Sequence, residues 1–363
     1  MTTPPELLLI AGTRPEVHKL APLAEACGAR ARWCWTGQQP QPPAEAVHGC
    51  WQRLVPPPHP LRRAPLLRYL QQTLHAQLQR QRPRAVGVQG DTASALAGAR
   101  AAAALGIGVV HLEAGLRSGD LRAPFPEEAY RREITRHADL HLAPSARACA
   151  QLRCEGVPAR RIVQVGSTAV DGLRLQPLPA VMQACDLLVD VHRRENAGRA
   201  LDCLALGLRS LARGGWRIGI AAHPNASWQR RWDRALGGAA GIVRLPPLAR
   251  AAWLARARAA RGVLSDSGGA AEELPYLGVP LLVYRRHSER PEALETRHAR
   301  LLSPRVDVQM DAAIERALGD PGWPAAWPLA ADSPYGDGHA GERAAAAIGG
   351  WLALRVEPRE ALP

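Results

Sequence analysis

The sequence VGVQGDT at residues 86–92 is an apolar run that ends in glycine and aspartate, and an alanine-rich segment with helical spacing follows it. This order predicts a buried strand, a tight turn and a helix. In open α/β sheets, side chains at the C-terminal ends of strands commonly contact ligands. Asp91 is therefore a candidate site residue.

The segment HLEAGLRSGDLRAPFPEEAYRREITRH at residues 111–137 is unusually dense in ionisable side chains. It places Glu113 and Glu127 among glycines and prolines, which interrupt regular structure. A single carboxylate at such a position is more often solvated or caps a helix. Taken as a group, Asp91, Glu113 and Glu127 are candidates for acid–base chemistry.

Strand-like and helix-like segments alternate along the 363 residues and form two series. This alternation predicts an α/β protein with two doubly wound, Rossmann-like domains, whose strand ends face a central cleft that binds the ligand. The expected strands are residues 7–11, 32–36, 85–88, 108–112, 140–143 and 162–165 in the first series, and 187–191, 217–221, 241–245, 262–265 and 280–284 in the second.

A proline-containing joint separates the two series, so we expect one domain at residues 1–174 and the other at residues 182–340. The segment at residues 341–354 is helical in pattern, but periodicity does not assign it to a domain. Residues 40–63 are rich in proline and poor in periodicity, which predicts an irregular loop or a mobile flap.

The net charge of +13 comes almost entirely from arginine, because Lys19 is the only lysine in the chain. Such a bias is compositional, and the arginines lack the interleaved aromatic residues of a nucleic-acid platform. We expect no nucleic-acid partner, although anionic small molecules remain natural ligands.

Seven cysteines, an odd number, show no spacing typical of a metal site and indicate reduced thiols. No apolar run reaches the ~18 residues of a membrane span, so a soluble, cytoplasmic protein without a metal is expected.

Four segments at predicted strand ends have the chemistry to bind phosphate. GTRPE at residues 12–16 and SDSGGAAEE at residues 265–273 each open a helix, where backbone N–H groups and the helix dipole favour an anion. VHRREN at residues 191–196 and SERPEA at residues 288–293 add a histidine and arginines. No GxGxxG, Walker or nucleophile-elbow sequence occurs, which argues against dinucleotide redox chemistry and triad hydrolysis.

These four segments, together with QGDT, HLEAGLRSGD, APFPEEAYRR and SPYGDG, occur in an order that resembles the non-hydrolysing UDP-N-acetylglucosamine 2-epimerase family. The resemblance extends from Gly12 to Glu342. It implies a fold like that of the GT-B glycosyltransferases, with the last helix returning to the first domain. It also implies a UDP-sugar substrate, no cofactor and a homodimer.

The resemblance implies two overlapping residue sets. The catalytic set is Asp91, Glu113, Glu127 and His192, and the UDP-binding set is Arg14, Lys19, His192, Trp253, Ser267, Gly268, Gly269, Glu273 and Arg290. In the family, a proton leaves C2 of the sugar while UDP departs from C1, and both return to the resulting glycal with the opposite configuration at C2. The carboxylate that removes the proton is not assigned. Gln38, Gln41, Arg193 and His223 match part of an allosteric UDP-sugar site.

Several positions depart from the family pattern, namely Gln39 for the usual His, Ser167 for Asn, Ala271 for Gln, Arg286 and His287 for Asp and Thr, and Arg297 and His298 for Gly and Thr. The added positive charge leaves a UDP-2,3-diacetamido uronate as an alternative substrate. A catalytically inactive UDP-sugar-binding protein, a hydrolysing epimerase and a GT-B glycosyltransferase are further alternatives. The intact VHRREN segment favours the non-hydrolysing reaction, and no acceptor site for a transferase is evident.

Overall fold

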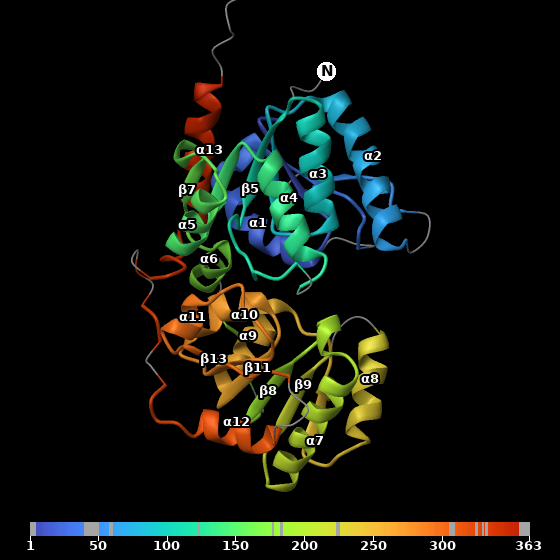
Figure 1. Ribbon diagram of the computed structural model, residues 1–363, viewed down its shortest axis with the longest axis vertical. Coiled ribbons are helices and arrows are strands. Elements are labelled where there is room, and N and C mark those ends of the chain that lie inside the picture. The colour runs from blue at the N-terminus through green and yellow to red at the C-terminus, as the bar shows by residue number, and fades with distance from the viewer. Residues whose placement is uncertain are drawn as a thin grey trace, which may run out of the picture. The chain divides into compact units, whose positions relative to one another are not determined.

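The computed structural model describes residues 5–39, 51–57, 61–121, 124–175, 178–181, 184–222, 226–304, 309–323, 326–328, 330 and 333–355. The chain divides into two compact units (Figure 1). The first comprises Met1–Gly172 and Ala330–Pro363, and the second comprises Leu173–Leu329.

The first unit is built on a seven-stranded sheet in which every neighbouring pair is parallel. The order is β3-β2-β1-β4-β5-β6-β7, so it reverses between β1 and β4. Both faces of the sheet are covered, which explains why strands such as LLLIA read as continuous apolar runs. The strands are β1 (Leu7–Ala11), β2 (Ala31–Trp35), β3 (Trp51–Arg53), β4 (Ala85–Gln89), β5 (Gly108–Leu112), β6 (Leu140–Ala143) and β7 (Ile162–Gln164).

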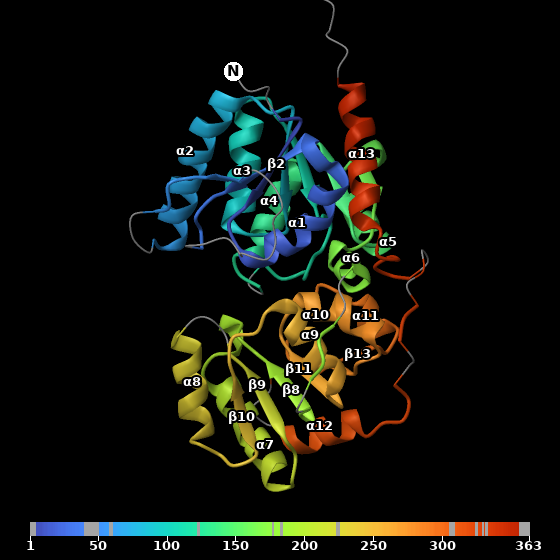
Figure 2. The same cartoon turned by 180° about the vertical axis from the view of Figure 1, so that it is seen from behind.

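Alternate residues of β1 enter two separate cores on opposite faces of this sheet. Leu8 and Ile10 pack with helices α2 (Arg63–Gln81), α3 (Ala93–Ala104) and α4 (Glu127–His137). Leu7 and Leu9 pack with α1 (Arg14–Cys27) and with α13 (Ala340–Leu354). Figure 2 shows these two helices side by side from behind. The remaining helices are α5 (Ala146–Cys154) and α6 (Thr168–Leu175), with 3-10 turns at Gly28–Arg30 and Ala159–Arg161.

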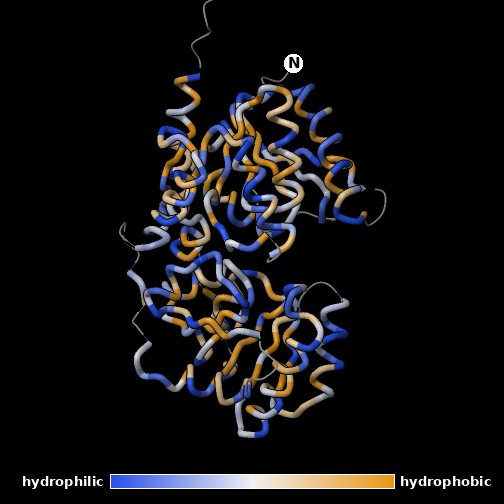
Figure 3. Tube along the Cα trace, viewed as in Figure 1, coloured by the Kyte–Doolittle hydropathy of each residue, from blue (hydrophilic) through white to orange (hydrophobic). Residues whose placement is uncertain are grey.

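The second unit repeats the plan with a six-stranded parallel sheet in the order β10-β9-β8-β11-β12-β13. In both units, hydrophobic residues concentrate along the strands (Figure 3). The strands are β8 (Leu187–Asp190), β9 (Ile218–Ala221), β10 (Ile242–Leu245), β11 (Gly262–Ser265), β12 (Leu281–Val283) and β13 (Ala299–Leu301). The helices are α7 (Arg199–Arg213), α8 (Ala226–Leu236), α9 (Arg250–Ala259), α10 (Gly268–Glu273), α11 (Glu292–Glu295) and α12 (Met310–Leu318), with 3-10 turns at Arg194–Asn196 and Leu274–Leu277.

The predicted fold class, two doubly wound α/β units, is confirmed. The prediction of an irregular loop over residues 40–63 is wrong for residues 51–53, which form β3 beside β2. Strand β13 was also not predicted, because Arg300 interrupts its short apolar segment. Residues 40–50 and 58–60 lie outside the described part of the chain. None of the described helices is both long and apolar enough to cross a membrane.

The segment after residue 330 is fixed to the first unit by hydrogen bonds. The carboxylate of Asp171 accepts the backbone N–H groups of Ala340 and Gly341 at 3.0 and 2.7 Å. The N–H of Ser167 donates to the Tyr335 carbonyl at 2.8 Å. Residues 330–340, which were expected in the second domain, therefore group with the first unit.

Candidate active site

Two loops with candidate site residues begin where the strand order of the first unit reverses. The loop after β1 runs through Gly12 and Thr13 to Arg14, the first residue of α1. The loop after β4 contains Asp91 and leads into α3. A Cβ on Gly12 would lie 2.0 Å from the hydroxyl of Ser94 in α3, so the close approach of the loop after β1 to the start of α3 requires glycine.

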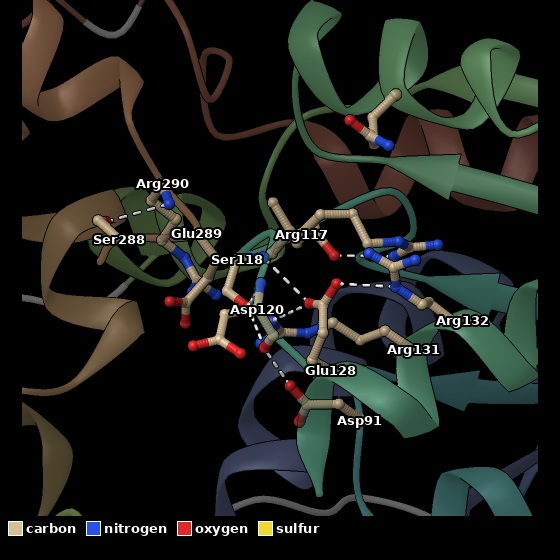
Figure 4. Close-up of polar contacts among 12 residues, drawn as sticks. Asp91, Arg117, Ser118, Asp120, Glu128, Arg131, Arg132, Ser288, Glu289 and Arg290 are labelled. Carbon is tan, nitrogen blue, oxygen red and sulfur yellow. Dashed lines mark hydrogen bonds and ion pairs between the residues drawn. The ribbon is translucent and has the colours of Figure 1, made fainter. Parts of the chain in front are cut away.

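Asp91 is held in place by an arginine of α4. Its Oδ2 lies 2.5 Å from the guanidinium of Arg131, which is 6% exposed (Figure 4). Arg131 also lies 3.6 Å from Glu128, a fully buried carboxylate. Glu128 in turn accepts the Ser118 N–H at 3.0 Å and pairs with Arg132 at 3.1 Å. Because carboxylates on two sides constrain Arg131, α4 helps to position Asp91.

Glu113 combines an unusual backbone with two side-chain partners. Its φ of 65° is left-handed, a conformation that costs roughly 1–3 kcal/mol for a residue other than glycine and is concentrated at functional sites. Its Oε1 lies 2.6 Å from Lys19 Nζ, and its Oε2 accepts a hydrogen bond from Gln89. A Cβ on Gly90 would lie 3.5 Å from the same Oε2, so Glu113 borders the loop that carries Asp91.

A small pocket opens beside the Lys19–Glu113 ion pair. The Ser167 hydroxyl accepts the Ala169 N–H at 3.2 Å, so the residue that replaces the usual Asn supports the start of α6. The lining residues of the pocket are Lys19, Leu112, Glu113, Pro144, Gly166, Ser167 and Thr168.

Glu127 is the first residue of α4 and follows a cis Phe125–Pro126 bond. It is half-buried. No other described residue forms a hydrogen bond or ion pair with its carboxylate. Glu127 therefore differs from Asp91 and Glu113, each of which is paired with a cation.

In the second unit, His192 lies just beyond β8 and beside two aspartates. Its Nδ1 is 3.1 Å from Asp190 and 3.7 Å from Asp266. Burial opposes the charged ring, but the carboxylates, Asp190 above all, outweigh burial and raise the pKa of His192 to about 9. The imidazole is therefore a cation at neutral pH, with 30% of its side chain exposed.

Asp266, which follows β11, organises the loop that carries His192. Its buried carboxylate accepts the backbone N–H groups of His192 and Arg193 at 3.0 and 2.7 Å. It also accepts the amide N–H of Asn196 at 2.8 Å. The loops after β8 and β11 are thereby joined where the strand order of this unit reverses.

Arg290 is buried between two carboxylates. Its Nε donates to Glu272, and a terminal nitrogen lies 2.9 Å from Glu289. A Cβ on Gly268 would lie 2.2 Å from this guanidinium, so glycine at the first position of α10 makes room for it. The ionic contacts hold the arginine in one orientation beside α10.

The remaining residues of the expected UDP-binding set lie on α9 and α10. A Cβ on Gly269 would meet nothing closer than the Ser267 hydroxyl at 3.9 Å, which leaves the backbone there uncrowded. Glu273 pairs with Arg250 of α9, whose Nε lies 3.0 Å away. Trp253 is half-buried, and its indole N–H has no acceptor among the described atoms.

Two of the four residues expected at an allosteric site fall within the described chain. The side-chain oxygen of Gln38 accepts from the N–H and hydroxyl of Ser94 at 3.0 and 2.7 Å. Arg193 donates to the backbone carbonyl of Asp266 at 2.8 Å. Gln41 and His223 lie outside the described residues, so the allosteric site stays a prediction.

The departures at Arg297 and His298 have local structural roles. Arg297 keeps the left-handed backbone, with a φ of 65°, that suits the glycine usual at this position. Its side chain is 65% exposed, and its guanidinium lies 3.8 Å from Asp320. The His298 ring lies 4.4 Å from the Trp327 ring. Both side chains therefore have partners within the second unit.

Two buried carboxylates of these loops, Glu16 and Asp266, were not singled out as site residues from the sequence. Both lie inside quoted segments, GTRPE and SDSGGAAEE. The sequence signal for both residues was an acidic residue near the start of a helix, a few positions from a glycine and beyond an apolar strand. Such a residue is usually a simple helix cap, so its contacts with a second loop required the tertiary structure.

Comparison with known proteins agrees with the family resemblance of the sequence motifs. A family model described as UDP-N-acetylglucosamine 2-epimerase matches residues 66–349. The chain belongs to the UDP-N-acetylglucosamine 2-epimerase family. It is thus a member of an isomerase family.

Relatives of this epimerase cover almost its whole length. A UDP-N-acetylglucosamine 2-epimerase from Yersinia pestis is 31% identical over 93% of this chain and 96% of its own. A co-structure of S. aureus MnaA with UDP has a TM-score of 0.85 at 28% identity and covers 98% of this chain and 99% of its own. The Methanocaldococcus jannaschii enzyme in complex with UDP-GlcNAc and UDP has a TM-score of 0.80 at 26% identity, covering 96% and 99%.

Proposed function

We propose that this epimerase inverts C2 of a UDP-2-acetamido sugar and converts UDP-N-acetylglucosamine to UDP-N-acetylmannosamine. The observation that carries the proposal is the division of the required chemistry between the units. Carboxylates surround the strand ends of the first unit, and a protonated histidine with a buried arginine lies at those of the second. The complex of the M. jannaschii relative with UDP-GlcNAc supports the choice of substrate.

The second unit would stabilise the leaving group. The hydrogen on C2 is weakly acidic, so its loss has to be coupled to cleavage of the bond between C1 and UDP. His192, a cation at neutral pH, and Arg290 would neutralise charge that develops on the departing diphosphate. Because Glu272 and Glu289 already orient Arg290, little reorganisation is needed during the reaction. Trp253 and Glu273 would contact the uridine.

The first unit would move the proton. Inversion requires removal from one face of C2 and return to the other, and therefore at least two acid–base groups. Asp91, Glu113 and Glu127 would share acid, base and sugar-binding duties. Loss of the C2 proton and of UDP leaves a C1–C2 double bond. UDP then adds back to C1 while a proton is delivered to the opposite face of C2.

The residues that suggested the uronate alternative differ in their surroundings. Arg297 pairs with Asp320, and the His298 ring lies against Trp327. Arg286 and His287 are exposed. Turnover of the neutral and uronate donors can be compared directly, and we expect the neutral donor to react faster.

The deciding experiment is proton NMR of the enzyme with UDP-N-acetylglucosamine in deuterium oxide. We expect deuterium at C2 of sugar that still carries UDP, together with signals of the UDP-mannosamine product. The variants Asp91→Asn, Glu113→Gln and Glu127→Gln should each lose activity, and full activity in one of them would remove that residue from the catalytic set. Tight UDP-sugar binding without exchange at C2 would instead identify an inactive binding protein.

A further inference from the structure

Glu16, the last residue of GTRPE, has a carboxylate enclosed at the start of α1. The residue is 1% exposed. Its Oε2 accepts the backbone N–H groups of Gly12 and Thr13 at 3.0 and 2.8 Å, and the Thr13 hydroxyl at 2.8 Å. A glutamate at the third helical position that reaches back to the residue before the helix is half of a capping box.

The second oxygen of Glu16 makes a contact that a helix cap does not need. The Thr92 hydroxyl donates to Oε1 at 2.6 Å, across 76 positions of sequence. This hydroxyl also accepts the Ala95 N–H at 3.0 Å, so its own proton points to Glu16. Thr92 follows Asp91 directly. One carboxylate therefore joins the loop after β1 to the loop after β4.

The surroundings of the Glu16 carboxylate disfavour its charged form. No described cation pairs with Glu16, and burial raises its pKa to about 7 although hydrogen bonds from Thr92, Gly12 and Thr13 oppose the rise. A capping box alone could be made by an exposed glutamate or by a glutamine without this desolvation. The buried carboxylate thus points to a requirement for the contact between the loops.

We propose that Glu16 is a positioning residue, which fixes the loop carrying Arg14 to the loop carrying Asp91 during epimerisation. The inference rests on the proposed function. Glu16 does not itself contact the reacting atoms. It keeps Arg14, a residue of the expected UDP-binding set, and Asp91, a candidate proton-transferring carboxylate, at a constant spacing. Misplacement of such groups by ~1 Å can lower rates by about a hundredfold.

The test uses variants at both ends of the contact in the full-length enzyme. Glu16→Gln retains an oxygen for the helix cap but cannot accept from both loops, and Thr92→Val removes the donor. We expect each to lower kcat at least tenfold with KM changed less than threefold. Thr92→Ser, which retains the hydroxyl, should restore at least half of the wild-type kcat. The double variant should lose little more than either single variant, because both remove the same contact.

A matched control and a second measurement separate positioning from stability. Thr73→Val makes the same exchange in α2, where the hydroxyl donates only to the Tyr69 carbonyl at 2.9 Å, and should retain activity. Hydrogen–deuterium exchange should increase at residues 90–95 in Glu16→Gln while the strands stay protected. A wild-type kcat in Glu16→Gln, whatever its melting temperature, would overturn the inference. An inactive wild-type enzyme would overturn the proposed function instead, and the exchange data would still report on the contact.

Discussion

His192 carries its charge mainly because of Asp190, with Asp266 as a second carboxylate. Asp190 lies 3.1 Å from the ring and contributes most to overcoming burial, so that the pKa reaches about 9. Asp190→Asn should lower this pKa, and kcat should then decline at a more acidic pH than in the wild type. An NMR titration of the His192 ring and a pH profile of kcat measure both effects. If the alkaline limb of the profile does not move, another group sets it.

The His192–Asp190 pair also predicts that the stability of the protein depends on pH. The folded-state pKa lies above the ordinary value of 6.5, so the contribution is fully present below pH 6.5 and is lost as the pH rises through about 9. Chemical unfolding of the wild type should lose stability over this window relative to Asp190→Asn. The control Glu133→Gln removes a carboxylate 3.8 Å from His137 in the first unit. Introduced into both the wild type and Asp190→Asn, it should leave the pH-dependent difference in stability between them unchanged.

The left-handed backbone of Glu113 can be tested with two variants that both lack the carboxylate. Glu113→Ala keeps a Cβ at a φ of 65°, whereas Glu113→Gly does not. We expect the glycine variant to be more stable by roughly 1–2 kcal/mol, and both to lack epimerase activity. Denaturant unfolding provides the comparison. Equal stability would show that the surroundings relax around position 113.

At the scale of elements, both units use a buried carboxylate to join two loops at the reversal of strand order. Glu16 connects the loops after β1 and β4, and Asp266 connects the loops after β8 and β11. The elements themselves follow from apolar strands and helix-start signals. The connections between loops depend on the parallel sheet, which brings the C-terminal ends of separate strands together.

The packing of α13 on α1 supplies a prediction at this scale. A Cβ on Gly341 would lie 2.5 Å from the Pro22 carbonyl, while one on Gly350 would meet nothing within 4 Å. Gly341→Ala should therefore destabilise the protein by about 1–3 kcal/mol, because the backbone of α1 would have to move. In the same helix, Gly350→Ala should stabilise it by up to about 1 kcal/mol through helix propensity. Thermal unfolding of the two variants should shift in opposite directions.

At the scale of the whole molecule, each unit has its own hydrophobic core, but the first is completed by the end of the chain. Ala344, Ile348 and Leu352 of α13 are buried beside Leu20 and Leu23 of α1. A chain that stops after residue 329 should therefore lose the unfolding transition of the first unit. The second unit has no part in that core, and its transition should persist. Calorimetry with peptide-resolved hydrogen exchange would assign the transitions, and an intact first unit in the shortened chain would contradict the prediction.

The sequence by itself determined the fold class, most of the strands and the segments that carry the candidate site. Residues such as Asp91 and His192 lie just beyond apolar runs, and that local pattern is visible without coordinates. Strands β3 and β13 were missed because polar or charged residues interrupt both short segments, WQR and ARL. Their place in the sheets comes from pairing with β2 and β12. Family resemblance supplied roles for residues that composition and spacing left open.

Only the tertiary structure decided which charges meet. The pairing of Asp91 with Arg131 and of Glu113 with Lys19 joins residues from different strand–helix units. It also decided that Glu16 spans two loops and that Arg297 faces Asp320. The physical reason is that helix and strand signals act over a few neighbouring residues. Ion pairs and buried hydrogen bonds depend instead on where a parallel sheet places distant strand ends.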